Sequence, residues 1–343
     1  MRGCWSFPGS HHEKHSLHAS ETLTPQSGVW PSRSEATRMP KVVNMDVIGI
    51  GALNYDRLYM VKNIAGGGEE ERAHSVVEAP GGSAANTIAG LSRLGARTGF
   101  IGVVGTDREG DFILDDLKKE GVDTAGIKRA KGTTGAIIGF VDRRGERALY
   151  AYPGVNDTLE INKRHAAYVR SARYLHLSSF VGDKSRRAQK MLLRELQEPR
   201  ISFSPGMLYA KKFRSIKSII KGSSVVFLNR EEIRLLTGRG YQDGAAELVG
   251  IGAHIVVVTL GSKGCYVADK EEVHLVKAYP SKVVDTTGAG DAFAAGFLYG
   301  LLEGRNIKLC AKIGNWVASR CIAKPGARDG LPYAKDLKKQ AII

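Results

Sequence analysis

The chain has few cysteines and no long apolar run, and both shortages limit the class of protein it can be. Its 343 residues include four cysteines, none in the paired spacing of a zinc site. No run of about 18 consecutive apolar residues occurs, which argues against a membrane-spanning helix. Cys310 and Cys321, expected on one helix, would lie roughly 16 Å apart along its axis, too far for a disulfide. We therefore expect no membrane partner and a reducing, cytoplasmic location.

Acidic residues are in the minority. The chain has 35 Asp and Glu against 50 Lys and Arg, which gives a formal net charge of +15. This balance favours anionic partners such as nucleotides, phosphorylated metabolites or nucleic acid. However, the charges are spread along the chain, with no block of five or six like charges. The basic segment 211–221 carries apolar residues near helical spacing, which indicates a solvated helix face, so we expect no nucleic-acid partner.

The composition otherwise predicts a globular α/β protein. Apolar residues make up 43% of the chain, and its 41 glycines suit many tight turns between strands and helices. From Met45 on, short apolar runs alternate with helical patterns, which predicts a parallel sheet covered on both faces. The expected strands are 46–50, 98–104, 174–177, 201–204, 225–228 and 255–259, and the expected helices are 84–94, 111–119, 184–196, 231–236, 245–250, 290–302 and 308–322.

Some expected strands do not fit that alternation. Residues 136–141 and 147–152 flank a polar turn and predict a hairpin, and 265–268 with 272–276 predict a second antiparallel pair. Two short early strands, 58–61 and 74–77, would form a small accessory sheet.

Residues 1–44 differ in composition from the rest. They have little apolar periodicity, many turn-forming residues, and no apolar stretch of the roughly 7–15 residues that a secretory signal needs. Four histidines (His11, His12, His15 and His18) crowd together and could indicate a metal-binding tract. We expect a disordered N-terminal extension, or an upstream extension of the reading frame with Met45 near the natural start. A metal-binding tract or a transit peptide is the less favoured interpretation.

The chemistry concentrates in residues 283–302, VVDTTGAGDAFAAGFLYGLL. Val283 and Val284 are expected to end a strand, and Gly288-Ala289-Gly290 to form a turn that opens a long helix. The start of a helix leaves backbone N–H groups unpaired and carries partial positive charge. Glycines there let an anion approach the backbone, so this turn is predicted to bind phosphate.

Asp291 follows in the first turn of that helix. A carboxylate there could simply cap the helix. Yet a carboxylate beside bound phosphate is repelled by it, so a base that takes a proton from an attacking hydroxyl explains the residue better. The chain has no P-loop, no complete dinucleotide fingerprint, no protein-kinase motifs and no H-E-x-x-H.

These motifs resemble those of the ribokinase family, the PfkB-type carbohydrate kinases. The segment D-T-T-G-A-G-D at 285–291 is similar to the C-terminal signature, and 81–110 is similar to the other signature. Matches in family order also include G-A-L-N-Y-D at 51–56, Asn229 with Glu232, and Thr259-Leu260-Gly261 followed by Gly264. The resemblance implies an α/β, ribokinase-like three-layer sandwich over 45–341, with a mostly parallel central sheet. It also implies a small β-lid from about 57–63, 72–78 and 133–152.

The resemblance also implies roles for individual residues. Asp291 would be the base, and the backbone of Gly288, Ala289 and Gly290 the anion hole. Substrate hydroxyls would be bound by Asn54, Asp56, Gly81, Gly82, Ser83, Asn86 and Asn156, a polar set that suits a polyol. The nucleotide would be bound by Asn229, Thr259, Gly261, Gly264 and Gly290.

Two metal sites are implied in the same way. Asn229 and Glu232 would orient hydrated Mg²⁺, although without the resemblance the pair indicates only a helix start. A K⁺ site would use Asp285, Thr287, Lys324, Gly326 and Gly330.

The implied activity is transfer of the terminal phosphoryl group of ATP to a hydroxyl of a sugar. Ser83 stands where ribokinases have lysine in G-G-K-G-A-N, and their substrate-binding glutamate is replaced near Ser178. Both departures argue against plain ribose. The form G-G-S-A-x-N is similar to nucleoside kinases, so a kinase for the ribose 5′-hydroxyl of a nucleoside is the alternative.

The sequence leaves three more functional classes open. A sugar-phosphate kinase is a third enzyme class, and the rivals outside enzymes are a basic nucleic-acid-binding protein and a metabolite sensor. Tyr152, Asn156 and His176 would shape the substrate pocket or belong to the core. A homodimer through the lid is a further expectation.

Overall fold

Alternating apolar residues explain why helices can cover both faces of the central sheet. In a strand, successive side chains point to opposite faces. In β10 (Ser223–Asn229), Val226 and Leu228 join one core cluster, whereas Val225 and Phe227 join another on the opposite face. The computed structural model describes residues 45–196 and 200–340. The expectations for 1–44, the extension and its histidine tract, lie outside these residues.

The central sheet has nine strands, and most of its pairs are parallel. Its spatial order is β13 (Val273–Val276), β12 (Cys265–Ala268), β11 (Ile255–Thr259), β10, β9 (Arg200–Ser204), β8 (Ala172–Ser178), β1 (Met45–Ile50), β4 (Thr98–Gly105) and β5 (Asp123–Ala130). Only β11–β12 and β12–β13 are antiparallel. The predicted mostly parallel sheet is confirmed, and β5, which has polar residues between its apolar ones, was not predicted.

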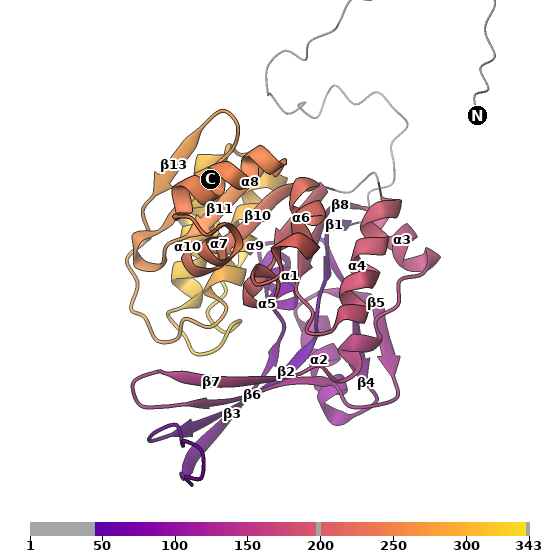
Figure 1. Cartoon of the computed structure of the whole chain (residues 1–343), viewed down its shortest axis with the longest axis vertical. Coiled ribbons are helices and arrows are strands. Elements are labelled where there is room, and N and C mark those ends of the chain that lie inside the picture. The colour runs from indigo at the N-terminus through magenta and orange to yellow at the C-terminus, as the bar shows by residue number, and fades with distance from the viewer. Residues whose placement is uncertain (1–44, 197–199, 341–343) are drawn as a thin grey trace, which may run out of the picture. The chain divides into compact units, whose positions relative to one another are not determined.

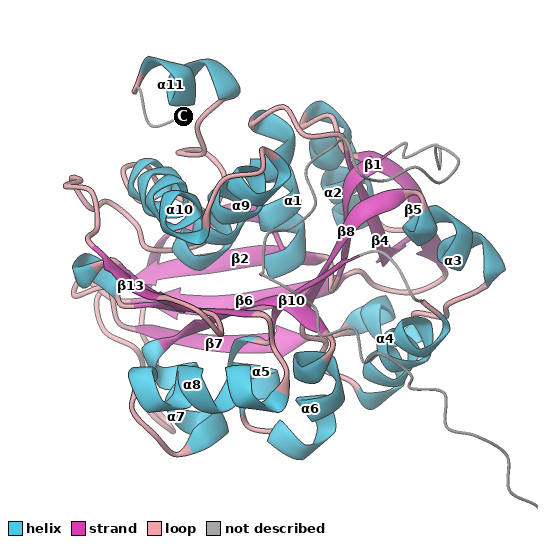
Figure 2. Cartoon of the chain, turned by 90° about the horizontal axis from the view of Figure 1, so that it is seen from above, coloured by secondary structure: helices cyan, strands magenta, loops and turns pink. Residues whose placement is uncertain are grey.

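Helices cover both faces of this sheet, as Figure 2 shows. One layer contains α1 (Ser83–Arg93), α2 (Arg108–Lys119), α9 (Ala289–Leu302), α10 (Ile307–Cys321) and α11 (Ala334–Lys339). The other contains α3 (Lys163–Arg170), α4 (Asp183–Glu195), α5 (Gly206–Ala210), α6 (Phe213–Lys221), α7 (Arg230–Thr237) and α8 (Tyr241–Ile251). The result is the predicted three-layer sandwich, and all described residues belong to one compact unit.

A second, four-stranded sheet extends away from the sandwich (Figure 1). Its order is β3 (Ala73–Gly81), β2 (Asn54–Val61), β6 (Gly135–Val141) and β7 (Arg147–Tyr152). We call it the lid sheet. The expected hairpin is β6–β7, and the early strands that did not fit the alternation are β2 and β3.

The expected strand ending at Val283 and Val284 is wrong. No strand lies between Val276 and the start of α9, where the chain is described throughout. The N–H of Val284 donates to the carbonyl of Ile322 at 2.8 Å, so this segment is tied to the end of α10 and not to a sheet edge. Both valine side chains are exposed. Apolar residues form a strand only where a neighbouring strand is available to pair with them.

The cysteines of the described residues are free thiols. Cys265, Cys310 and Cys321 are buried and unpaired, and the last two share α10 as expected. None of the described helices is long and apolar enough to span a bilayer.

Close packing between β1 and α1 predicts a stability effect. A Cβ on Gly49 would lie 2.5 Å from Cγ1 of Ile88 and 2.9 Å from the Phe100 ring. Gly49→Ala should therefore lower the free energy of unfolding by about 1–3 kcal/mol, measured by urea denaturation. The control is Gly250→Ala, on α8 with nothing within 4 Å of the new methyl, which should be neutral or stabilising. Equal stability of Gly49→Ala and the unmodified protein would contradict this packing.

Candidate active site

The carboxylate of Asp291 joins the beginnings of two helices. It lies in the first turn of α9 and accepts hydrogen bonds from Ser83 Oγ at 2.7 Å and Asn86 Nδ2 at 2.9 Å, both from the first turn of α1. Burial raises the pKa of Asp291 to about 6, although the bonds from Asn86 and Ser83 favour its charged form. A carboxylate with this pKa is mostly ionised at neutral pH and able to accept a proton.

The turn before α9 has the backbone that the motif predicts. Gly288 adopts φ 73°, and a Cβ there would lie 2.6 Å from Cβ of Ala327. Only glycine can adopt this positive φ and also leave room for Ala327 without strain. No side chain of the described residues caps this helix end. The N–H of Ala289 donates to the carbonyl of Thr286 at 3.2 Å, so the next N–H, that of Gly290, is the one available to an anion.

The expected substrate segments also meet at this place. Asn54 at the start of β2 pairs with Gly81 at the end of β3, and Gly82 then caps α1 with φ 108°. The Asp56 carboxylate lies against Gly81, where a Cβ would be 2.2 Å from its Oδ1. That Oδ1 is buried and has no hydrogen-bond partner among the described residues.

Asp56 has an unusual electrostatic environment. Burial raises its pKa to about 7; Arg328 opposes the shift, and the nearby Asp291 adds to it. A buried acceptor without a partner is costly unless a donor reaches it. Asp56 is therefore suited to a ligand hydroxyl.

Arg328 is a site residue that sequence reasoning missed. It is 5% exposed, and its Nε donates to Asn86 Oδ1 at 2.9 Å while Nη1 pairs with Asp116. Since Nε occupies the amide oxygen of Asn86, the amide NH₂ must face Asp291. Arg328 thus orients the residue that holds Asp291. It belongs to no signature, and an arginine in a Gly-rich loop, G-A-R-D-G, looks exposed in the sequence.

Asn156 lies behind the site and not in it. Its Oδ1 accepts from the N–H of Leu53 at 2.9 Å, and its Nδ2 donates to the Leu53 carbonyl and to Asn54 Oδ1, each at 3.0 Å. The side chain is 2% exposed. The structure therefore gives it protein partners only, and its contact with the site is through Asn54.

The other pocket residues suggested by the sequence are elsewhere. His176 is fully buried in β8 and bonds Ser202, and Tyr152 is half exposed on β7. The core interpretation is therefore correct for His176. Ser178, near which the resemblance places the substrate-binding glutamate of ribokinases, is also buried, and its Oγ accepts from the N–H of Ala84.

A cavity of about 640 Å³ adjoins the N-terminus of α9. Thr259, Gly261, Gly264 and Gly290, all expected at the nucleotide, line it. Sequence reasoning missed the other wall, formed by the connection before α9 and by α10, which includes Tyr279, Pro280, Ser281, Asn315 and Ser319. Asn315 holds that connection by donating to the carbonyls of Val276 and Lys277; nothing local in the sequence indicates this.

Asn229 and Glu232 form the reciprocal cap of α7. Asn229 Oδ1 accepts from the N–H groups of Glu231 and Glu232 at 2.9 and 2.8 Å, and Glu232 Oε2 accepts from the N–H of Asn229 at 2.9 Å. The helix-start interpretation is therefore correct for this pair. Burial raises the pKa of Glu232, and its second oxygen is not used by the cap.

The residues expected at a monovalent cation make a hydrogen-bonded cluster. Asp285 Oδ1 accepts from the N–H and hydroxyl of Thr287, and Oδ2 accepts from the N–H of Gly326 at 2.9 Å. Lys324 is exposed, and Gly330 packs on the carbonyl of Cys321. Burial alone would raise the pKa of Asp285, but its hydrogen bonds outweigh burial and lower it.

A lid arginine also reaches this cluster. Arg147 of β7 donates to Thr287 Oγ1 at 2.7 Å and to Asp285 Oδ1 at 2.8 Å. Sequence reasoning missed this contact, which joins the lid sheet to the turn before α9. A guanidinium already supplies positive charge to Asp285, so the carboxylate does not depend on a cation for compensation.

The buried carboxyls predict how stability depends on pH. Asp56 and Asp291, with pKa values raised to about 7 and about 6, bind protons more tightly when folded than when unfolded. They therefore favour the folded state at about pH 4 and lose that contribution as the pH rises to about 7.

Asp56→Asn should be more stable than the unmodified protein at about pH 8, by roughly 1–2 kcal/mol, and the difference should shrink near pH 4. Urea denaturation at both pH values measures it.

Asp115→Asn is the control, because that carboxylate is exposed on α2. It should change stability little at either pH. If Asp56→Asn were no more stable at the higher pH, a buried charge at position 56 would be refuted.

Comparison with known proteins shows the family to which the chain belongs. Residues 45–334 match the pfkB family carbohydrate kinases. An uncharacterized sugar kinase of Archaeoglobus fulgidus is 43% identical over 72% of this chain and all of its own length. The 2-dehydro-3-deoxygluconokinase of Bacillus subtilis is 30% identical over 75% of this chain and 84% of its own. Arabidopsis thaliana ribokinase, solved with ribose and ATP, superposes with a TM-score of 0.76 at 24% identity, over 86% of this chain and 98% of its own. The chain therefore belongs to the PfkB family of carbohydrate kinases.

Proposed function

We propose that this kinase transfers the terminal phosphoryl group of ATP to a hydroxyl of a sugar, with Asp291 as the general base. One observation supports this above all: the carboxylate of Asp291 lies in the first turn of a helix whose N-terminus has no side-chain cap, and that N-terminus, at Ala289 and Gly290, lines a cavity of about 640 Å³. The first group can accept the proton of an attacking hydroxyl, and the second can hold the phosphoryl group that is attacked.

Phosphoryl transfer depends mainly on positioning and charge neutralisation. Ser83 and Asn86 donate to Asp291 and so keep its carboxylate oriented. In this proposal Asn54 and Asp56 bind other hydroxyls of the sugar, and Gly81 and Gly82 allow its close approach. The N–H groups of Gly288 and Gly290 would stabilise charge on the phosphoryl oxygens.

Magnesium fits the residues at the start of α7. Among residues 45–196 and 200–340, no three acidic, histidine or cysteine side chains are grouped to enclose a metal ion. Mg²⁺ bound to a nucleotide commonly keeps several waters and needs few protein ligands. The oxygen of Glu232 that the cap leaves unused, with Asn229 beside it, would orient such waters. When bound, the ion would neutralise charge on the phosphates.

The lid sheet would exclude water from the reaction. Arg147 would link its position to the turn that holds the phosphoryl group. The lid sheet also exposes apolar side chains on both faces: Val77 and Leu149 on one, and Val76 and Tyr150 on the other. Exposed apolar residues of this kind are typical of an interface, which supports the homodimer through the lid as a proposal.

A sugar is the favoured acceptor, because the Archaeoglobus relative is named a sugar kinase. A nucleoside is the second candidate, since Ser83 retains the G-G-S-A-x-N form and contacts Asp291 where ribokinases carry a lysine. The +15 charge alone does not favour a nucleic-acid-binding protein, because the charges are spread along the chain without a block of like charges.

The deciding experiment is a substrate panel. The protein is incubated with Mg-ATP and pentoses, hexoses, sugar acids or nucleosides, and ADP formation is measured. We expect turnover with a sugar, and Asp291→Asn should lower kcat by roughly 10²–10⁴, the usual effect of a general base, with little change in nucleotide affinity. Turnover with nucleosides alone would favour the second candidate. Full turnover by Asp291→Asn would refute the base.

Arg147→Gln tests the link between the lid and the anion-binding turn. Loss of its bonds to Asp285 and Thr287 should let water compete with the sugar. The ratio of ATP hydrolysed to sugar phosphorylated should rise about tenfold or more, a 1.4 kcal/mol change in relative barriers. The control is Arg144→Gln, on the same hairpin, whose one ion pair within the described residues is with Asp142. An unchanged ratio in Arg147→Gln would contradict the link.

A further inference from the structure

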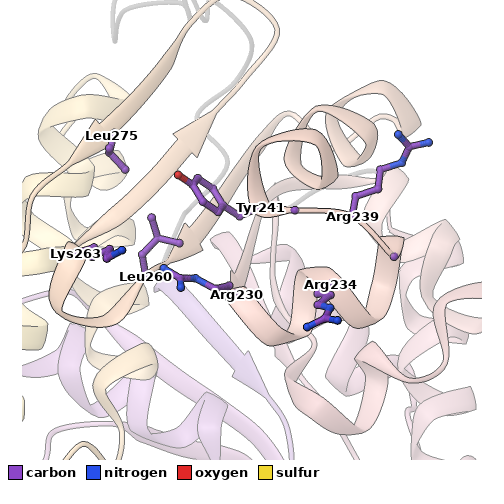
Figure 3. Close-up of a pocket in the computed structure, with 9 residues that line it drawn as sticks. Arg230, Arg234, Arg239, Tyr241, Leu260, Lys263 and Leu275 are labelled. Carbon is purple, nitrogen blue, oxygen red and sulfur yellow. The ribbon is translucent and has the colours of Figure 1, made fainter.

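A second cavity, of about 450 Å³, is lined in part by the same turn that lines the nucleotide cavity (Figure 3). This turn is the short 3₁₀ helix η2 (Gly261–Lys263). Gly261 and Ser262 line the nucleotide cavity, whereas Lys263 and the preceding Leu260 line the second one. We call it the α7–α8 pocket, because the junction of these two helices forms its other wall. The two cavities have no lining residue in common.

Every charged side chain that lines the α7–α8 pocket is basic: Arg230, Arg234, Arg239 and Lys263. Arg239 pairs with Glu247 at 2.9 Å. The other three form no ion pair with residues 45–196 or 200–340. Unpaired cations around one concavity create a positive potential that attracts anions. Phosphate is the anion that such a set binds best, because each cation can donate to a different oxygen.

The rest of the pocket is apolar and aromatic. Leu260, which lines the pocket, is 8% exposed, and the ring of Tyr241 is held edge-on against Tyr266, with centroids 5.4 Å apart. Figure 3 shows Arg230 and Lys263 converging beside Leu260, with the Tyr241 ring directed toward the same space, while Arg239 points outward. A charged end and an aromatic end are thus combined within the size range of small-molecule sites.

We propose that the α7–α8 pocket binds a phosphorylated metabolite with a planar ring, of the size of a nucleoside monophosphate, as an effector of the kinase. Arg230 and Lys263 bind its phosphate, and the ring packs between Tyr241 and Leu260. A nucleic acid is less suitable, because the basic residues surround one cavity and do not follow an extended groove.

Two connections would carry the effect to the nucleotide. The first is the η2 turn, which contributes residues to both cavities. It is closed by the hydrogen bond from the N–H of Leu260 to the carbonyl of Gly264 at 2.8 Å. Helix α7 runs from Asn229, expected at the triphosphate, to Gly238 in the pocket. A ligand that shifts either element changes nucleotide affinity, and by linkage the nucleotide changes the affinity of that ligand equally.

The test measures binding of AMP to the full chain by calorimetry, with a non-hydrolysable ATP analogue saturating the nucleotide cavity. We expect one AMP site, weakened at least tenfold by Arg230→Gln and by Tyr241→Ala. Arg214→Gln removes the same charge from exposed α6 and should bind AMP normally. Binding of inorganic pyrophosphate, which has no ring, should be weakened by Arg230→Gln but not by Tyr241→Ala.

Kinetics add a second readout. AMP should change the KM for ATP in the unmodified protein and in Arg214→Gln, and not in Arg230→Gln. The proposal is overturned if AMP gives no binding heat, if both pocket variants bind it normally, or if only an RNA oligonucleotide binds and does so in a salt-sensitive way. Because binding is measured without turnover, these results stand apart from the choice of sugar substrate.

Discussion

The contact between Asp291 and the first turn of α1 is the interaction on which the site depends. Asp291 belongs to α9, and its two partners, Ser83 and Asn86, lie more than 200 positions earlier in the chain. Two helix beginnings are thereby held at one point. Glycines precede each helix at a positive φ, Gly82 at 108° and Gly288 at 73°, so the backbone itself can face a ligand where they meet.

A second layer of polar contacts supports this arrangement. Arg328 is buried, bonds Asn86 and pairs with Asp116, so the acidic groups of the site are balanced without exposure to water. Losing one member of such a network leaves a buried charge without compensation, which is costly. The lid sheet adds a different connection, because Arg147 bonds both Asp285 and Thr287. The turn before α9, which we propose to bind the phosphoryl group, is therefore linked to the lid sheet.

Much of the fold was predictable because its signals are local. Apolar runs such as 255–259 and the helical pattern at 290–302 depend only on neighbouring residues. The failures have the same cause. Val283 and Val284 look like a strand, yet no sheet edge is available to them, and β5 pairs with β4 despite its polar residues. Strand formation is decided by a partner that lies far away in the sequence.

By itself the sequence determined membership of the kinase family, through the order of its motifs, and it predicted a carboxylate at the start of a Gly-rich helix and a set of polar residues suited to a polyol. Only the tertiary structure decided which side chains meet. It brought in Arg328 and Arg147, moved Asn156 behind Asn54, and placed His176 in the core. The reason is physical: residue type and spacing set what a group can do, whereas burial, pKa and hydrogen-bond partners arise from segments that become neighbours only on folding.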